Sequence, residues 1–111
     1  MFLCEAALGK QRLITRDGEV GWDEKDPVSA GGFDSCLAVG RTEPDAGQDL
    51  QVQFDASGPV AVPQGPVKAS PTAGASTSSF SQSEYLVFKE SQVRIRYIVQ
   101  MEFEETGSRW H

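Results

Sequence analysis

The sequence has few of the residues that mark disulfide scaffolds, metal centres and membrane proteins. It contains two cysteines, Cys4 and Cys36, whereas a secreted domain of this size usually carries more. It has no Cys-x-x-Cys pair and a single histidine, His111, so no zinc site is expected. No apolar run approaches the length of about 18 residues that a membrane helix needs, and the start of the chain lacks the basic residues of a signal peptide. These absences indicate a soluble intracellular chain whose two free thiols contribute to packing.

The charge balance is acidic, with 16 Asp and Glu against 10 Lys and Arg and a formal net charge of -6. An acidic chain repels phosphates, so direct binding to nucleic acid is not expected. The length of 111 residues suffices for one small domain. The pair Gly31-Gly32 does not form a G-x-G-x-x-G fingerprint, so a Rossmann fold is not expected.

Alternation of apolar and polar residues predicts a β-rich chain with little helix. The predicted strands cover residues 1–8, 34–39, 50–54, 59–63, 84–89 and 92–103. Residues 1–8 fit either a buried strand or a short helix, because an apolar run of this length has no diagnostic period. The last strand has the strongest alternation, with one apolar face made of Val93, Ile95, Tyr97, Val99, Met101 and Phe103.

Glycine, proline and small polar residues predict the connections between these strands. Residues 9–32 are expected to be a connection with one short helical turn after Asp23, and residues 42–47 a turn in which Glu43 and Asp45 are structural. The composition of Pro63–Ser83 fits either a linker or a long loop. Residues 104–111 form a polar tail.

Glu84 is the residue with the strongest indication of chemistry. Successive residues of a strand point to opposite faces, so Glu84, Leu86 and Phe88 share one face, and Tyr85 and Val87 share the other. A carboxylate beside apolar neighbours can be partly desolvated and held rigidly, which suits catalysis. The alternative is a solvated carboxylate at the mouth of a hairpin.

The remaining aromatic and basic side chains of this region have simpler interpretations. Tyr85 and Phe88 are expected to be core residues of the sheet. Arg94 and Arg96 are expected to form a solvated or ion-paired strand face rather than a phosphate clamp.

The run SQSEYLVFKESQVRIRYIVQMEF resembles the C-terminal segment of the poly(ADP-ribose) polymerase family. Four upstream blocks continue the resemblance in the same order, namely MFLCEAALG, GFDS, GRTEPD and VPQG. The resemblance implies an α+β, β-rich fold with a mainly antiparallel sheet, the C-terminal half of an ADP-ribosyltransferase catalytic fold. It also implies a partial catalytic domain over residues 1–103, a strand at residues 1–8 and a long loop at Pro63–Ser83.

The resemblance implies a chemistry and a role for Glu84. The family transfers ADP-ribose from NAD to protein acceptors and releases nicotinamide, with NAD as substrate and no metal. Glu84 falls at the position of the family's catalytic Glu, where it would also contact NAD. Gln82 and Ser83 resemble the acceptor-side rim of the site, and a polar loop end is the alternative. The blocks are most similar to a nuclear member of the family that responds to DNA damage and mostly attaches single ADP-ribose units.

The resemblance also implies what this chain does not supply. The family's catalytic His and Tyr precede the segment that matches Met1, and Tyr85 and Tyr97 do not fall at the position of that Tyr. DNA would be contacted only through regions absent from this chain, and no membrane is involved. The chain is therefore expected to be a fragment that is inactive in isolation. A non-catalytic β-rich interaction module and a truncated inactive fragment are the alternatives.

Overall fold

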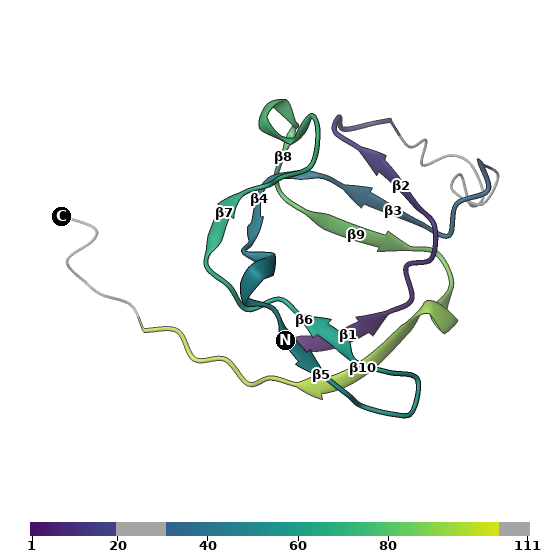
Figure 1. The fold of residues 1–111 in the computed structure, drawn as a ribbon, viewed down its shortest axis with the longest axis vertical. Helices are drawn as coiled ribbons and strands as arrows, with labels where there is room; N and C mark the ends of the chain where they lie inside the picture. Colours follow the sequence, from purple (N-terminus) through teal and green to yellow (C-terminus); the bar gives the residue numbers. More distant parts are fainter. Residues whose placement is uncertain (20–30, 105–111) are drawn as a thin grey trace.

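A computed structural model describes residues 1–19 and 31–104 (Figure 1). The described residues form ten short strands and three single-turn 3-10 helices, which confirms the prediction of a β-rich chain. The elements are β1 (Phe2–Ala6), β2 (Gln11–Ile14), β3 (Ser35–Ala38), β4 (Gly40–Pro44), η2 (Ala46–Gln48), β5 (Leu50–Val52), β6 (Val60–Val62), β7 (Val67–Ala69), η3 (Ala75–Thr77), β8 (Phe80–Gln82), β9 (Glu84–Val87), η4 (Glu90–Gln92) and β10 (Val93–Ile98).

The strands pair into four small sheets in which antiparallel pairs outnumber parallel ones. One sheet has the order β2-β3-β9, with β2 parallel and β9 antiparallel to the central strand. A second has the order β7-β4-β8, with an antiparallel and a parallel pair. The other two are the antiparallel pairs β1-β10 and β5-β6. The arrangement agrees with the mainly antiparallel α+β class that the resemblance implies.

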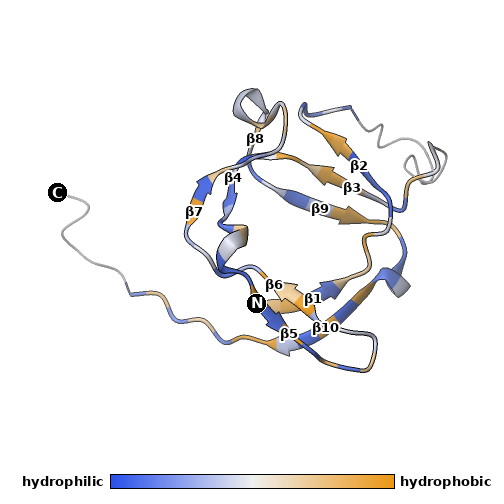
Figure 2. Cartoon of the chain, viewed as in Figure 1, coloured by the Kyte–Doolittle hydropathy of each residue, from blue (hydrophilic) through white to orange (hydrophobic). Residues whose placement is uncertain are grey.

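The β2-β3-β9 sheet carries the core. Ile14, Cys36 and Ala38 are buried on one of its faces, and Phe33, Phe80, Leu86 and Phe88 pack against them. In Figure 2 the hydrophobic colour lies at the end of β2 and along β3. Phe88 therefore lies against the core as expected, whereas Tyr85 is 55% exposed on the opposite face. The prediction that Tyr85 is a core residue was wrong, because the described residues do not cover that face of β9.

Four strands lie in segments that were predicted to be connections. They are β2 within residues 9–32, β4 across the predicted turn at residues 42–47, and β7 and β8 within the predicted loop Pro63–Ser83. Each has three to five residues. A segment this short shows too little alternation to be recognised, and here pairing with a distant strand defines it. The helical turn predicted after Asp23 lies outside the described residues.

The last strand is shorter than predicted. β10 ends at Ile98 rather than at residue 103, and the pairing with β1 ends where the Val99 amide donates to the Met1 carbonyl at 2.8 Å. Residues 99–104 continue away from the sheets without regular structure (Figure 1). The strand ends there because no described strand pairs with those residues.

The β1-β10 sheet presents large apolar side chains to solvent. Phe2, Leu3, Ile95 and Tyr97 are all exposed. Cys4 on β1 is also exposed, so the prediction that it packs in the interior was wrong, whereas Cys36 is buried. In the part of the chain that the structure describes, no helix is long and apolar enough to cross a membrane.

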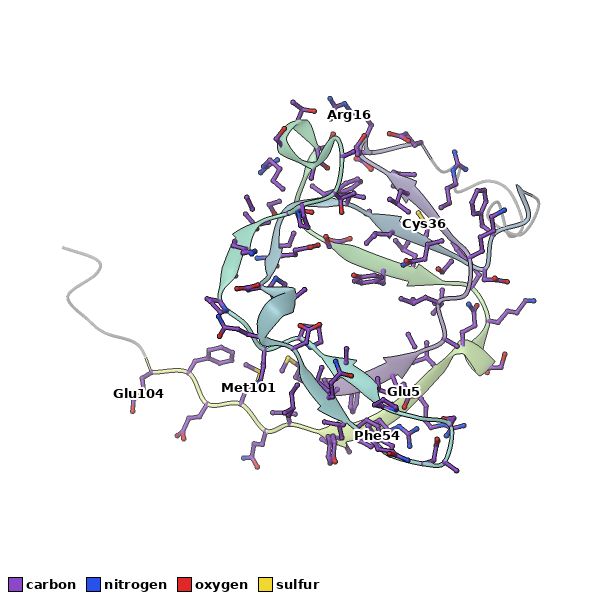
Figure 3. All side chains as sticks on the ribbon, in the orientation of Figure 1. Glu5, Arg16, Cys36, Phe54, Met101 and Glu104 are labelled. Atoms are coloured by element: carbon purple, nitrogen blue, oxygen red, sulfur yellow. The ribbon has the colours of Figure 1, made fainter. Side chains whose placement is uncertain are left out.

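Arg96 joins the β1-β10 sheet to the β5-β6 hairpin. Its Nε donates to Glu5 Oε2 at 2.7 Å, and its Nη2 lies 3.5 Å from Asp55 Oδ2. Its guanidinium also lies 4.5 Å from the centre of the Phe54 ring. Glu5 and Phe54 lie on the same side of the molecule in Figure 3, at the hairpin. The ion-paired strand face expected for Arg94 and Arg96 is confirmed, since Arg94 also lies 3.7 Å from Asp55.

Arg96→Lys is expected to lower the free energy of unfolding by about 1–3 kcal/mol. The Arg96 side chain is 17% exposed, and lysine cannot reproduce both the planar contact with Phe54 and the hydrogen bond to Glu5. Arg94→Lys is the matched control, because that side chain is 68% exposed and its change is expected to stay within about 0.5 kcal/mol. Urea unfolding measures both, and equal effects would contradict the role of Arg96.

Candidate functional site

Glu84 is the first residue of β9, as predicted. It lies opposite Ala38 in the antiparallel register, and Leu86 lies opposite Cys36. This register places Glu84, Ala38, Cys36 and Leu86 on one face of the sheet. The carboxylate is thus carried by the strand that borders the buried core.

The Glu84 side chain borders a cavity of about 130 Å³ on this face. Its floor is apolar, and its polar lining comes from Glu84 and from the Asp17–Gly18 turn that follows β2. The apolar lining residues are Ile14, Cys36, Ala38, Phe80, Leu86 and Phe88. The predicted sharing of one face by Glu84, Leu86 and Phe88 is therefore confirmed.

Of the two environments that the sequence left open for Glu84, the structure has the solvated one. The residue is exposed rather than partly desolvated. Among residues 1–19 and 31–104, no group donates a hydrogen bond to its carboxylate, so both oxygens can accept bonds from a ligand. Desolvation would have to come from a bound ligand or from other protein, because solvent reaches the open side of this face.

Cys36 lies in the same cavity but is poorly suited to chemistry. Burial raises the pKa of its thiol, the charge on Arg12 lowers it, and the charge on Glu19 raises it again, with burial the largest effect. A thiol with a raised pKa is a poor nucleophile at neutral pH. Cys36 is therefore a packing residue, as expected.

Gln82 and Ser83 do not share the cavity of Glu84. They line a second cavity, of about 410 Å³, with Tyr85 on the other side of β9. Ser83 Oγ accepts from the Gly40 amide at 3.0 Å and lies 3.4 Å from Glu43 Oε2, to which it donates. The structure thus separates the expected rim residues from Glu84 by the thickness of the strand.

Close backbone contact fixes the start of β9. A Cβ atom placed on Gly40 would lie 2.2 Å from the Ser83 amide nitrogen and 2.3 Å from the Gln82 carbonyl carbon. Only glycine permits this approach. Gly40 thereby holds the two residues that precede Glu84 against β4.

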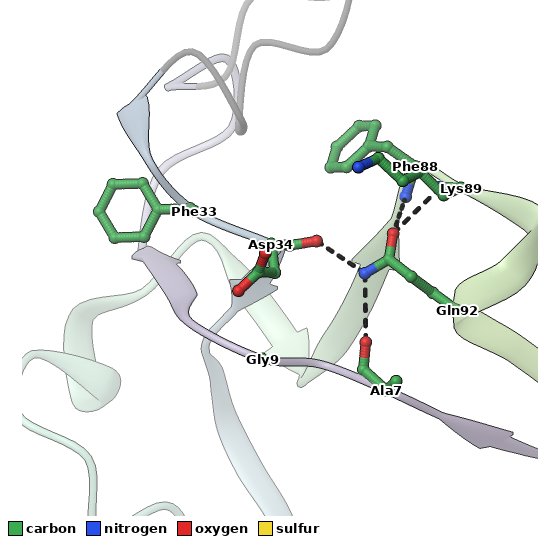
Figure 4. A pocket seen from close by; sticks show the side chains of 7 residues that line it. All are labelled: Ala7, Gly9, Phe33, Asp34, Phe88, Lys89 and Gln92. Carbon is green, nitrogen blue, oxygen red and sulfur yellow. Dashed lines mark hydrogen bonds between the residues drawn. The ribbon is translucent and has the colours of Figure 1, made fainter.

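Gln92 fixes the other end of β9 (Figure 4). Its Oε1 accepts from the amides of Phe88 and Lys89 at 3.2 and 3.1 Å. Its Nε2 donates to the carbonyls of Ala7 and Asp34 at 3.1 and 2.8 Å. The Gln92 side chain thereby connects the segment after β9 to the segment after β1 and to the residue before β3. The strand that carries Glu84 is held at its start by the Gly40 contact and at its end by Gln92.

This arrangement can stabilise positive charge on a ligand and accept hydrogen bonds from its hydroxyl groups. A positioned carboxylate beside an apolar surface performs both tasks. Sequence reasoning missed Asp17 and Ile14 as neighbours of Glu84, because the parallel pairing of β2 with β3 brings them there and no local pattern signals such pairing.

Comparison with known proteins places the chain in a family. The poly(ADP-ribose) polymerase catalytic domain matches residues 1–103. The protein mono-ADP-ribosyltransferase PARP3 of Mus musculus is 50% identical over 101 residues, which is 91% of this chain and 17% of that protein. The PARP3 of Gallus gallus is 50% identical over 103 residues, or 93% of this chain and 18% of that protein. The PARP3 of Homo sapiens is 46% identical over 102 residues, or 91% of this chain and 17% of that protein. The chain therefore spans less than a fifth of the length of these relatives.

Proposed function

The chain belongs to the poly(ADP-ribose) polymerase catalytic-domain family, and we propose that it forms the Glu84-bearing part of an NAD-dependent protein ADP-ribosyltransferase. The observation that carries the proposal is the position of Glu84, at the start of a strand held at both ends and beside an accessible cavity. In the reaction the bond between nicotinamide and ribose C1′ breaks, and nicotinamide leaves with the bonding electron pair. An acceptor side chain then bonds to C1′ and loses a proton.

Glu84 would contribute to this reaction in three ways. Positive charge develops on the ribose as the neutral nicotinamide departs, and a fixed carboxylate stabilises that charge. The second carboxylate oxygen can accept a hydrogen bond from a ribose hydroxyl. Glu84 can also orient the acceptor nucleophile and receive its proton. All three tasks need an accessible carboxylate, and Glu84 is exposed.

The relatives suggest the product and the setting. They are named mono-ADP-ribosyltransferases, so we propose that single ADP-ribose units are transferred to protein acceptors. We further propose a nuclear location and a link to DNA repair. DNA would be contacted through regions other than residues 1–103, because this acidic chain repels phosphates.

A non-catalytic interaction module is the second candidate. The exposed apolar side chains of the β1-β10 sheet favour it, because exposed large apolar side chains are available to contact a partner. The two candidates differ in whether NAD is consumed.

The test uses the longest product of the gene that contains residues 1–111, incubated with NAD and a mixture of protein acceptors. We expect release of nicotinamide together with a mass increase of the acceptors by one ADP-ribose unit. Acceptors that bind without any release of nicotinamide would favour the interaction module and overturn the enzymatic proposal.

The polypeptide of residues 1–111 alone is expected not to bind NAD at micromolar concentration and not to modify itself. The matched residues 1–103 contain no histidine, so the family's ribose-binding His is not among them. Without a closed pocket, water screens the charge of Glu84. Isothermal titration of NAD into the purified polypeptide measures this, and saturable micromolar binding would show that these residues contain a more complete pocket.

A further inference from the structure

The cavity on the Tyr85 face of β9 has the composition of a binding site. Its volume is about 410 Å³, and it lies between β4, η2, β7 and β9. Pro44, Pro63 and Val67 supply apolar walls, and Val67 is 66% exposed. The cavity faces away from the Glu84 cavity, since Tyr85 and Glu84 are successive strand residues.

Two carboxylates contribute to this cavity and no basic residue lines it. Glu43 comes from β4, and Asp49 lies between η2 and β5. Among residues 1–19 and 31–104, neither has a cationic partner within 4.0 Å. The neighbouring Asp45 differs, because Lys68 Nζ lies 3.3 Å from its Oδ1. The cavity therefore has negative charge that the described part of the chain does not balance.

Tyr85 adds an aromatic surface to the same space. Burial raises the pKa of its hydroxyl, and the charges on Glu43 and Asp49 raise it further. Glu43, Asp49 and Tyr85 line the same cavity, and the raised pKa keeps the phenol protonated at neutral pH. An aromatic face beside two carboxylates is a favourable environment for an organic cation.

We infer that this cavity binds a basic side chain, preferably arginine, from an extended segment of a partner protein. The aliphatic stem would lie against Pro44 and Val67, and the guanidinium would lie between Glu43, Asp49 and the Tyr85 ring. Arginine suits the site better than lysine because its planar group stacks on aromatic rings and bonds to two carboxylates at once. The inference goes beyond the proposed transferase function and does not depend on it.

A capped pentapeptide with one central arginine tests the inference, with the same peptide carrying citrulline as its neutral control. Binding to the 111-residue chain is followed through backbone amide chemical shifts. We expect saturable shifts around Glu43, Asp49 and Tyr85 with the arginine peptide, and a dissociation constant at least about tenfold larger with the citrulline peptide.

Matched substitutions distinguish this site from general charge attraction. Glu43→Gln combined with Asp49→Asn is expected to weaken binding by about tenfold or more, and Tyr85→Ala by several-fold. Glu90→Gln combined with Glu102→Gln removes the same two charges from exposed positions that line neither cavity, and is expected to leave binding unchanged. Equal binding of both peptides, or equal weakening by this control variant, would overturn the inference whatever the outcome of the NAD assays. A further outcome would also overturn the inference. It is self-association of the chain that the Glu43, Asp49 and Tyr85 variants abolish but the arginine peptide does not inhibit, which would indicate that a second copy of the chain occupies the cavity.

Discussion

Glu84→Gln is expected to reduce ADP-ribosyl transfer by about 10²- to 10³-fold in the longest gene product while leaving the fold intact. Glutamine keeps the size of the side chain and one acceptor oxygen but removes the negative charge. The loss is greatest in the transition state, where positive charge has developed on the ribose. Among the described residues the Glu84 carboxylate has no hydrogen-bond or ion-pair partner, so the free energy of unfolding is expected to change by less than about 0.5 kcal/mol.

The measurement is the single-turnover rate of nicotinamide release at saturating NAD, with thermal unfolding as the check on folding. Glu90→Gln is the matched control, because Glu90 is an exposed carboxylate in η4 that lines neither cavity. A lower rate of nicotinamide release in Glu84→Gln, with an unchanged rate in Glu90→Gln, supports a role of Glu84 in the chemical step. Unchanged turnover in Glu84→Gln would exclude the proposed role.

The strands that could be predicted have a local signal in the sequence. β5 was predicted from apolar residues at every second position, and β9 and β10 were predicted with starts that were correct or nearly correct. The face that Glu84 shares with Leu86 and Phe88 followed from the same periodicity. The cavity beside Glu84 did not follow, because its floor comes from Cys36, which the pairing of β3 with β9 brings there, and from Ile14, which the pairing of β2 with β3 brings there.

The wrong prediction about the exposure of Tyr85 has a physical cause. Tyr85 was assigned to the core because apolar neighbours in a strand normally indicate burial. Burial depends on what covers a face, and strand periodicity describes only which residues share it. The described residues cover the Cys36 face in part and leave the Tyr85 face open to a cavity.

The contact between β4 and the residues before Glu84 was also invisible in the sequence. Gly40 lies just outside the strand predicted at residues 34–39, whereas in the structure it begins β4 and is buried. Gly40 pairs with Phe80 in the parallel register, and its amide donates to Ser83 Oγ at 3.0 Å. The absence of a side chain at this position therefore sets how closely two strands approach.

Gly40→Ala is expected to destabilise the fold by about 3 kcal/mol or more. The added methyl group would lie 2.2 Å from the Ser83 amide nitrogen, and Cβ contacts below 3.0 Å are essentially never observed. Both obstructing groups are backbone, so no side-chain rotation relieves the contact and the strands must separate. The movement breaks the hydrogen bond to Ser83 and displaces the next residue, Glu84. A displacement of about 1 Å at a reacting group can lower the rate about 10²-fold, so transfer is expected to decrease even in the folded fraction.

Gly47→Ala is the matched control, because the nearest atom to its added methyl is a side-chain atom, Asp45 Oδ1, at 3.3 Å, and alanine suits the helical turn of η2 better than glycine. Chemical denaturation of both variants measures the loss of stability. Nicotinamide release measured under folding conditions gives the transfer rate per folded molecule, so the two effects are separated. A Gly40→Ala protein that is less stable yet fully active per folded molecule would show that Glu84 is positioned independently of β4. Such a result would leave the hydrogen bonds of the Gln92 side chain as the principal restraint on β9.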